Sequence, residues 1–305
     1  MINLEKLIIP LILTGVYYLF QKPKKIKPEY FKNKHILITG ASSGIGLKIS
    51  EILRDYDCKL YLLARSFNNS KFLNVNYFKC DCSNYDQVNQ IIKEIDNKID
   101  IVIHAAGAGD WKFLDEMNIE EVNQCLQAPL QASLNVTHCL LPQFRENNNG
   151  QMVFIQSPVI KQPWSSCTAY SVSRWGMKGL AESLRADLFK TNITVSEIVL
   201  AKTNSNYFRT NQTALKRFPK IGYLIGEITP REAAFATIWM IQNKKEYYYY
   251  PHMMRIVTYL QYLFPGIVKY LTLVTSFYSS TVVSSSSTSE ESPPSTAKES
   301  PSTFN

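Results

Sequence analysis

A serine, a tyrosine and an arginine near the middle of the chain carry side chains that can exchange a proton with a substrate oxygen. Ser157 ends an apolar run, Tyr170 lies thirteen residues later, and Arg174 follows four residues on. If this stretch is helical, Tyr170 and Arg174 share one face. A tyrosine hydroxyl has an ordinary pKa of about 10, so it needs a neighbouring cation to work near neutral pH. These residues could therefore act together on a carbonyl or alcohol oxygen.

A glycine-rich turn lies near the start of the chain, between a run typical of a strand and a stretch typical of a helix. Gly40, Gly44 and Gly46 are placed where a backbone without Cβ can turn sharply and bring its amides close to a pyrophosphate at the positive end of the helix. The sequence therefore predicts a dinucleotide site formed by Thr39, Gly40, Ser42, Ser43, Gly44, Ile45 and Gly46.

Apolar runs and helix-period stretches alternate around these residues. The predicted strands are His35–Ile38, Lys59–Leu63, Val75–Lys79, Ile99–His104, Gln151–Gln156 and Thr194–Leu200. The predicted helices are Gly44–Leu53, Asp86–Ile95, Ile119–Leu141 and Ala169–Phe189. This alternation predicts the α/β class, with a Rossmann-like, doubly wound parallel sheet in a single domain, and ligands bound at the carboxyl ends of the strands.

The spacing TGxxxGxG, together with the interval from Ser157 to Tyr170, resembles the short-chain dehydrogenase/reductase family from about Lys34 to Arg209. The chain as a whole resembles the membrane-anchored, member-7-like branch of this family. The resemblance implies that Tyr170 is the proton donor or acceptor, that Ser157 holds the substrate oxygen, and that Arg174 takes the place of the family's lysine beside the cofactor ribose.

The resemblance also implies the remaining cofactor contacts. Arg65 lies where an acid would hold the ribose diol of NAD(H), so it favours NADP(H), while Asp81 lies where relatives hold the adenine edge. Ala105 and Gly107 belong to a variant of the family's NNAG turn, His104-Ala105-Ala106-Gly107. Ser205 takes the place of the threonine that reaches the carboxamide.

Three departures from the family pattern bear on catalysis. Arg174 replaces lysine, and its bulkier guanidinium keeps the charge but does not lose its proton. Pro129 falls where relatives carry an asparagine of the proton relay, with Asn123 and Asn135 as the nearby alternatives, and Leu200-Ala201 replaces a Pro-Gly pair. They favour an alternative, a catalytically weak or inactive nucleotide-binding protein with a sensing or scaffolding role at a membrane.

Both ends of the chain are set apart by composition. Residues 1–27 combine an uncharged apolar run from Leu7 to Phe20 with a lysine cluster, typical of a membrane anchor, although a helix lying on the protein's own core is the alternative. Residues 28–252 form the predicted domain. Over residues 253–278 the sequence predicts two short amphipathic pieces, separated at Phe264-Pro265-Gly266. Three roles remain open for them: dipping into a bilayer interface, covering an apolar pocket, or packing in the core. Residues 279–305 predict a disordered Ser/Thr/Pro-rich tail.

The remaining features narrow the class of function. The net charge of +8 is not gathered into a basic stripe, which argues against nucleic acid, and the six cysteines are scattered without metal-ligand spacing. The leading expectation is an NADP(H)-dependent oxidoreductase that interconverts a hydrophobic alcohol and its carbonyl compound, of a lipid, retinoid or steroid-like kind. It is expected at the endoplasmic reticulum or a related endomembrane, facing the cytosol. A homo-oligomer through the helices around Leu126 and Leu180 is a further expectation.

Overall fold

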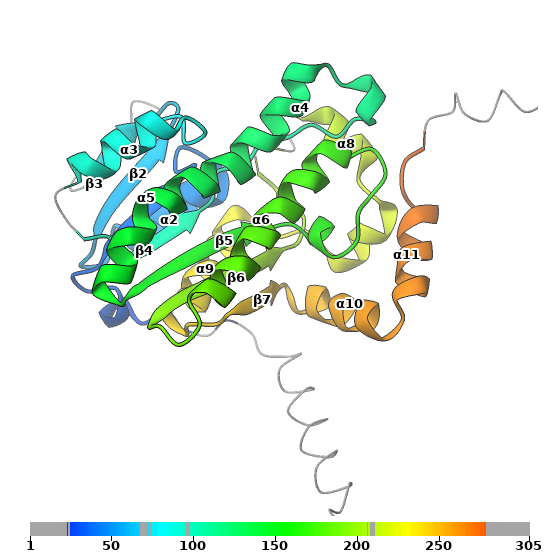
Figure 1. Ribbon diagram of the computed structural model, residues 1–305. Helices are drawn as coiled ribbons and strands as arrows, with labels where there is room; N and C mark the ends of the chain where they lie inside the picture. The colour runs from blue at the N-terminus through cyan, green and yellow to red at the C-terminus, as the bar shows by residue number, and fades with distance from the viewer. Residues whose placement is uncertain are drawn as a thin grey trace, which may run out of the picture.

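A parallel β-sheet carries the fold, which is given by a computed structural model that describes residues 23, 25–67, 72, 75–95, 98–205, 207 and 211–278. Within these residues seven strands pair in the order β3-β2-β1-β4-β5-β6-β7 (Figure 1). They are β1 (His35–Thr39), β2 (Lys59–Ala64), β3 (Val75–Lys79), β4 (Ile101–His104), β5 (Gly150–Gln156), β6 (Ile193–Leu200) and β7 (Tyr247–Tyr250). Because the order reverses between β1 and β4, a crevice opens at the carboxyl ends of these two strands.

Helices cover both faces of the sheet. They are α2 (Gly44–Leu53), α3 (Tyr85–Glu94), α4 (Ile119–Leu126), α5 (Ala132–Asn147), α6 (Thr168–Asp187), α8 (Gln212–Arg217), α9 (Pro230–Gln242), α10 (His252–Leu263) and α11 (Pro265–Val274). Short helical turns are η1 (Pro28–Tyr30), η2 (Leu114–Glu116), η3 (Gln127–Gln131), η4 (Pro158–Ile160) and η5 (Lys220–Ile225).

Strand alternation divides the core between these two layers. Ile36 and Ile38 of β1 pack with α2 and α9, whereas Leu37, which points to the opposite face, packs with α3, α5 and α6. Figure 1 shows α5 and α6 in front of the sheet and α2 and α9 behind it. The predicted doubly wound Rossmann-like sheet is confirmed.

The helix predicted over Ile119–Leu141 required correction. It forms two α-helices, α4 and α5, joined by η3, which is a π-helical turn, and α5 continues to Asn147. Pro129 lies inside this turn and has no N–H to donate to the preceding turn, so the wider geometry accommodates the missing bond. The neighbouring Leu130 packs on α6 at Gly176, where an added Cβ would lie 2.7 Å from Leu130 Cδ2.

Helices α8 and α9 and strand β7 were not predicted. Helix α9 begins with a capping box, in which Thr229 Oγ1 accepts from the Glu232 N–H and the Glu232 carboxylate accepts from the Thr229 N–H. The pattern Thr-Pro-Arg-Glu is the signal that could have located its start. Where two short amphipathic pieces were expected over residues 253–278, the structure has the helices α10 and α11.

The N-terminal anchor and the C-terminal tail lie largely outside the described residues, which omit residues 1–22, 24 and 279–305. None of the helices in the described part of the chain is both long and apolar enough to cross a bilayer. The end of the lysine cluster is described, and it runs along the core. Ile26 is buried, the Lys27 N–H donates to Gln242 Oε1, and Gln242 Nε2 donates to the Lys25 carbonyl.

Candidate active site

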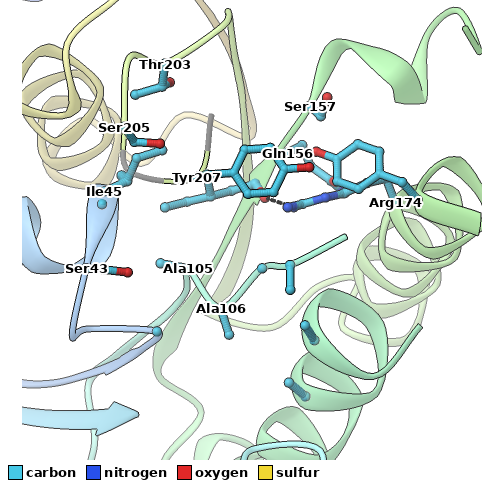
Figure 2. Close-up of a pocket in the computed structure, with 18 of the residues that line it drawn as sticks. Ser43, Ile45, Ala105, Ala106, Gln156, Ser157, Arg174, Thr203, Ser205 and Tyr207 are labelled. Carbon is cyan, nitrogen blue, oxygen red and sulfur yellow. Dashed lines mark hydrogen bonds between the residues drawn. The ribbon is translucent and has the colours of Figure 1, made fainter. Parts of the chain in front are cut away.

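A cavity of about 400 Å³ lies at the carboxyl ends of the central strands (Figure 2). Arg65 follows β2 and Asp81 follows β3, on one side of β1, whereas Ser157 follows β5 on the other side. The cavity therefore extends across the point where the strand order reverses. It brings together most of the predicted site residues: Gly40, Ser42, Ser43, Gly44, Ile45, Arg65, Asp81, Ala105, Gly107, Ser157, Tyr170, Arg174 and Ser205.

Two of the predicted residues, Thr39 and Gly46, do not line this cavity but shape the turn behind it. Thr39 Oγ1 accepts hydrogen bonds from the backbone N–H groups of Ala105 and Ala106, each at 3.2 Å, and so joins the ends of β1 and β4. A Cβ on Gly46 would lie 2.6 Å from the Gly40 carbonyl oxygen. Helix α2 can therefore approach the turn only with glycine at this position.

The glycine turn presents unfilled backbone donors to the cavity. Gly40 has φ +64°, and an added Cβ would lie 2.7 Å from Ala106 Cα, whereas Gly44 has φ +53° with open space beside it. Ser43 caps α2 without a side-chain hydrogen bond to its first turn. The first amides of this ten-residue helix are thus available to an anion, and a helix N-terminus favours negative charge. This cradle fits the pyrophosphate of a dinucleotide.

The Arg65 and Asp81 side of the cavity is polar. Arg65 is exposed at its rim. Asp81 Oδ1 accepts from the Ser83 N–H at 2.9 Å and from Ser83 Oγ at 2.7 Å, which fixes the carboxylate in the turn after β3. A cationic guanidinium at the end of β2 suits a phosphate on the cofactor ribose.

Tyr170 and Arg174 meet on α6 as the helical spacing predicted. Tyr170 is only 8% exposed, and Arg174 Cζ lies 5.2 Å from the centre of its ring. Arg174 Nη1 donates to the Ile155 carbonyl at 2.8 Å, and a Cβ on Gly107 would lie 2.7 Å from Arg174 Nη2. The guanidinium therefore occupies the space left by Gly107 and places its charge beside Tyr170.

Ser157 lines the same cavity as Tyr170 and Arg174. It follows β5 and caps η4, where its Oγ accepts from the Val159 N–H at 3.5 Å. Figure 2 shows Ser157 and Arg174 on one side of the cavity and Ser43 and Ile45 on the other, with the Tyr207 ring between them. A substrate carbonyl near Ser157 would therefore lie on the side of the cavity that holds Arg174.

Aromatic side chains that the sequence analysis missed form the wall beside Tyr170. Trp111 lies 6.0 Å from the Tyr170 ring, 5.3 Å from Trp164 and 5.8 Å from Phe218, measured between ring centres. Tyr207 Oη donates to the Gly109 carbonyl at 2.7 Å, and burial raises the pKa of Tyr207 well above its usual range. These residues come from separate loops without a shared spacing, so only the fold assembles them. They form an apolar surface suited to a hydrophobic substrate.

Two further differences from the expected pattern concern Ser205 and the relay asparagine. Thr203, which was not predicted, lines the cavity near Ser205, so either hydroxyl can face a carboxamide. Neither Asn123 nor Asn135 lines the cavity. Asn135 is buried, and its Nδ2 donates to the carbonyls of Cys82 and Ser83.

The histidine of the variant turn, His104, belongs to the core of the fold. Burial lowers the pKa of His104 to about 3, so the ring is neutral at physiological pH. Its Nε2 lies 3.2 Å from Thr137 Oγ1, and its ring stacks on Phe154 with the ring centres 4.6 Å apart. His104 therefore packs in the core and does not line the cavity.

Comparisons with known proteins agree with this geometry. The family model for short chain dehydrogenase matches residues 34–216. A 3-dehydrosphinganine reductase of Arabidopsis thaliana is 28% identical over 64% of this chain and 61% of its own length. A protein named dehydrogenase/reductase SDR family protein 7-like, of Dictyostelium discoideum, is 27% identical over 88% of this chain and 92% of its own.

A solved structure shares the fold. A short chain dehydrogenase of Burkholderia cenocepacia, in complex with NADP, superposes with a TM-score of 0.70 at 18% identity, over 80% of this chain and 98% of that one. The present chain spans about six tenths of the length of the plant reductase. The chain belongs to the short-chain dehydrogenase/reductase family of oxidoreductases.

Proposed function

We propose that the protein is an NADP(H)-dependent oxidoreductase that interconverts a hydrophobic alcohol and its ketone or aldehyde. The observation that carries this proposal is the position of Tyr170, which lies between the Arg174 guanidinium and an aromatic wall in the cavity that also contains the glycine turn. A proton donor, a cation and an apolar surface then meet in one space. That combination suits a carbonyl group attached to an apolar body.

The residues of this chain would divide the reaction as follows. The nicotinamide cofactor, when bound, supplies or accepts a hydride. In the direction of reduction the Tyr170 hydroxyl donates a proton to the substrate oxygen, and Ser157 Oγ holds that oxygen by a hydrogen bond. Arg174 stabilises the negative charge left on Tyr170, because its guanidinium lies beside the ring and stays protonated.

The preference for NADP(H) over NAD(H) rests on Arg65. Its exposed guanidinium at the end of β2 would pair with a ribose 2′-phosphate, whereas NAD(H) gives it no partner. We expect Arg65→Asp to weaken NADPH binding about tenfold to a hundredfold, since a charge-assisted pair contributes about 1.5–3 kcal/mol, and to weaken NADH binding much less.

The proposed substrate class is a lipid-like carbonyl compound. The aromatic wall around Trp111 supports an apolar substrate, and two relatives are named as reductases of 3-dehydrosphinganine or 3-ketodihydrosphingosine, which are long-chain ketones. Residence at the endoplasmic reticulum or a related endomembrane, with residues 1–27 as the anchor, is part of the same proposal. It rests on the apolar run and the lysine cluster of the sequence.

The second candidate, a nucleotide-binding protein with little catalysis, has specific support. Arg174 Nη1 is held by the Ile155 carbonyl, and Pro129, which the family resemblance aligns with the relay asparagine, lies in the π-helical turn η3. In that case the cavity would bind the cofactor in the same way, but proton transfer through Tyr170 would be slow.

The test combines cofactor binding with turnover. We expect NADPH fluorescence to report tight binding, and a panel of apolar ketones that includes 3-dehydrosphinganine to be reduced. Tyr170→Phe should lower kcat by about 10²–10⁴-fold while retaining NADPH binding. Tyr85→Phe, a change at an exposed tyrosine on α3, is the matched control.

The two candidates differ in their outcomes. Binding of NADPH without turnover, with activity gained in Arg174→Lys, would establish the catalytically weak protein. A chain that does not bind NADPH at all would contradict both candidates.

A further inference from the structure

We infer that helices α10 and α11, with the neighbouring turn η5, form a docking surface for a lipid bilayer. Residues 259–278, named here the apolar corner, extend away from the sheet at the edge of the molecule (Figure 1). In this stretch only Thr272 is buried, whereas most of the large apolar side chains are exposed. The exposed aliphatic and phenylalanine side chains include Leu260, Leu263, Phe264, Ile267, Leu271 and Val274.

This exposure is too extensive for an ordinary surface helix. Leu263 is 69% exposed and Ile267 is 58% exposed, and on η5, which packs against α11, Leu224 is 74% exposed. Monomeric soluble proteins rarely expose contiguous apolar patches of more than a few hundred Å² unless the patch binds something. Of the three alternatives left open for residues 253–278, packing in the core is therefore excluded for most of the apolar corner.

The charges around the apolar corner favour a lipid surface as the occupant. Between Tyr247 and Tyr278 the chain has no aspartate or glutamate. Lys269 on α11 and Lys220 on η5 are both exposed beside the apolar side chains. Exposed Tyr262 and Tyr270 add rings with a polar tip, a type of side chain enriched where a protein meets the headgroup layer. At the Phe277 end of the corner, Arg217 lies over the Phe277 ring and forms an ion pair with Glu116. Exposed apolar side chains beside lysines, in a stretch that has no acid of its own, suit the interface of an anionic bilayer.

The apolar corner is also bonded to the loops around the cavity. Ser165 Oγ donates to the Phe277 carbonyl at 2.6 Å, directly after Trp164, and the Lys220 N–H donates to the Thr275 carbonyl at 3.0 Å, near Phe218. Trp164 and Phe218 belong to the aromatic wall. The end of the apolar corner at Thr275 and Phe277 is therefore hydrogen-bonded to the same loops that carry Trp164 and Phe218.

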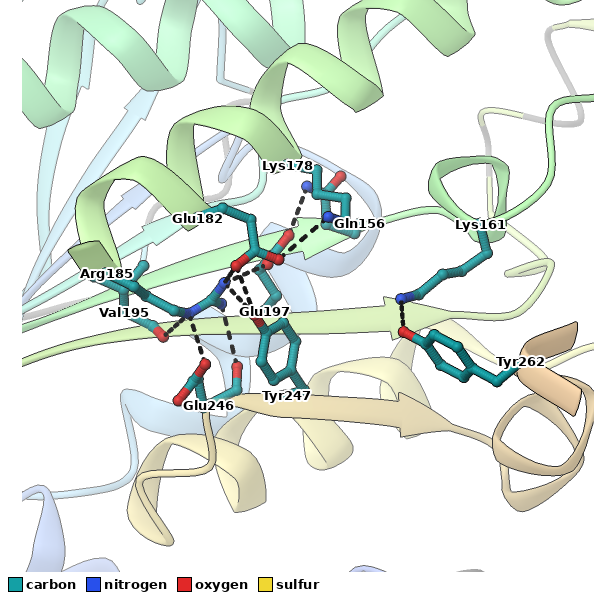
Figure 3. Close-up of polar contacts among 10 residues, drawn as sticks. All are labelled: Gln156, Lys161, Lys178, Glu182, Arg185, Val195, Glu197, Glu246, Tyr247 and Tyr262. Carbon is teal, nitrogen blue, oxygen red and sulfur yellow. Dashed lines mark hydrogen bonds and ion pairs between the residues drawn. The ribbon is translucent and has the colours of Figure 1, made fainter. Parts of the chain in front are cut away.

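A second contact joins α10 to the loop that follows Ser157. Lys161 Nζ donates to Tyr262 Oη at 2.9 Å, as Figure 3 shows, and Gln261 Nε2 donates to the Lys161 carbonyl. Docking of the apolar corner would thus place the aromatic wall close to the bilayer, from which an apolar substrate could enter. The entry of substrate rests on the proposed function, whereas docking does not.

The test is vesicle co-sedimentation of the full chain. Because the N-terminal apolar run is itself expected to bind lipid, the parent protein carries Leu11→Glu and Leu13→Glu. Adding Leu263→Glu and Ile267→Glu should lower partitioning onto phosphatidylserine-containing vesicles at least about tenfold. Each change removes apolar area that docking would bury in the bilayer, and each adds a negative charge that the anionic lipid repels. The control pair, Ile119→Glu and Phe189→Glu, changes equally exposed apolar residues elsewhere and should alter partitioning less than about twofold.

The outcomes separate the possible occupants and separate docking from the proposed function. If Leu263→Glu with Ile267→Glu leaves partitioning unchanged, the inference is wrong. The inference is also wrong if the parent protein is a dimer that these two substitutions convert to a monomer, because the corner would then bind a second copy of the chain. Each variant is also assayed with a water-soluble ketone. Loss of vesicle binding with unchanged soluble turnover supports docking, whereas absent turnover in every variant contradicts the proposed function alone.

Discussion

Arg174, which stands where the family pattern has a lysine, differs from lysine in the space it fills as well as in its chemistry. The guanidinium is larger than an ammonium group, and it is accommodated because Gly107 has no side chain and because the Ile155 carbonyl accepts from Nη1. The charge beside Tyr170 is therefore positioned by two backbone groups at the ends of β4 and β5. This arrangement can be tested without changing any side chain that touches the substrate.

Gly107→Ala should displace Arg174, since the new Cβ would lie 2.7 Å from Nη2. We expect kcat for ketone reduction to fall about tenfold to a hundredfold, because the stabilising charge moves away from Tyr170. The free energy of unfolding should change by less than about 1.5 kcal/mol. The matched control is Gly179→Ala on the exposed side of α6, where no atom lies within 4 Å of the added Cβ. Full activity of Gly107→Ala would show that the position of Arg174 does not matter.

His104 makes the folded state sensitive to acid. The pKa of His104 in the folded protein is about 3, below the usual value of 6.5. Between pH 3 and pH 6.5 the unfolded chain therefore binds a proton at His104 that the folded chain does not bind. The stability due to the neutral ring is present above pH 6.5 and is lost as the pH falls towards 3. Between pH 6.5 and 5 this loss should reach about 2 kcal/mol.

The measurement is urea unfolding of the unsubstituted protein and of His104→Asn at pH 6.5 and pH 5. Between pH 6.5 and 5, the free energy of unfolding of the variant should fall by about 2 kcal/mol less than that of the unsubstituted protein, whatever the stability of the variant at neutral pH. Equal losses in the two proteins would show that His104 is able to take up a proton in the folded state.

At the scale of elements, the sequence predicted the strands and helices whose patterns are local. The runs that became β1 to β6 are short, rich in aliphatic or aromatic residues, and followed by turns, and the glycine turn indicated the start of α2. The glycine turn and the pair Tyr170 and Arg174 are formed by residues close together in the chain, so spacing was enough to locate them. The aromatic wall joins Trp111, Trp164 and Phe218 from distant loops, and no local pattern relates them.

The missed elements have a similar explanation. Helix α9 is buried nearly all round, so its apolar residues show no one-sided period, and β7 is four consecutive tyrosines next to a lysine-rich turn. Tertiary contacts define β7, since it pairs with β6 and is joined to α6 through Arg185. The π-helical turn at Pro129 was likewise hidden, because a proline predicts a disrupted helix but not the form of the disruption.

Arg185 joins α6 to β6 and β7 through a partly buried charge cluster (Figure 3). Its Nη1 lies 2.9 Å from the Glu197 carboxylate, which is 1% exposed, and donates to Tyr247 Oη at 2.8 Å. Burial raises the pKa of Glu197, while the attraction of Arg185 opposes this shift. Without Arg185, a buried carboxylate would lack its cation.

Arg185→Met should therefore lower the free energy of unfolding by about 3–5 kcal/mol at pH 8. The loss should be smaller at pH 5, because a carboxyl whose folded pKa is raised stabilises the protein in its protonated form, and that stability disappears as the pH rises. The double variant Arg185→Met, Glu197→Gln should recover part of the loss. Chemical denaturation at pH 5 and pH 8 measures the free energy of unfolding of the unsubstituted protein, the single variant and the double variant. An equal loss at the two pH values in Arg185→Met would contradict this account.

At the scale of the whole molecule, the proposed functional surfaces lie at different places around one sheet. The glycine turn and Tyr170 lie at the carboxyl ends of the strands, and the apolar corner extends from the β7 edge. The outer faces of α5 and α6 form a third surface, where Leu134, Val172 and Trp175 are exposed. If the apolar corner contacts lipid, this third surface remains accessible to a second copy of the chain.

We therefore expect a homo-oligomer that forms through the outer faces of α5 and α6. Burying Val172, which is 55% exposed, with its neighbours can contribute to an interface of about 800 Å² per partner, the usual size for a stable pair. Val172→Glu should convert the oligomer to a monomer, because association would bury the new charge in an apolar interface. Phe189→Glu, at the far end of α6, should leave the mass unchanged. Light scattering in a non-ionic detergent measures the mass of each variant, and a parent protein that is already monomeric would refute this assignment while leaving the bilayer docking of the apolar corner unaffected.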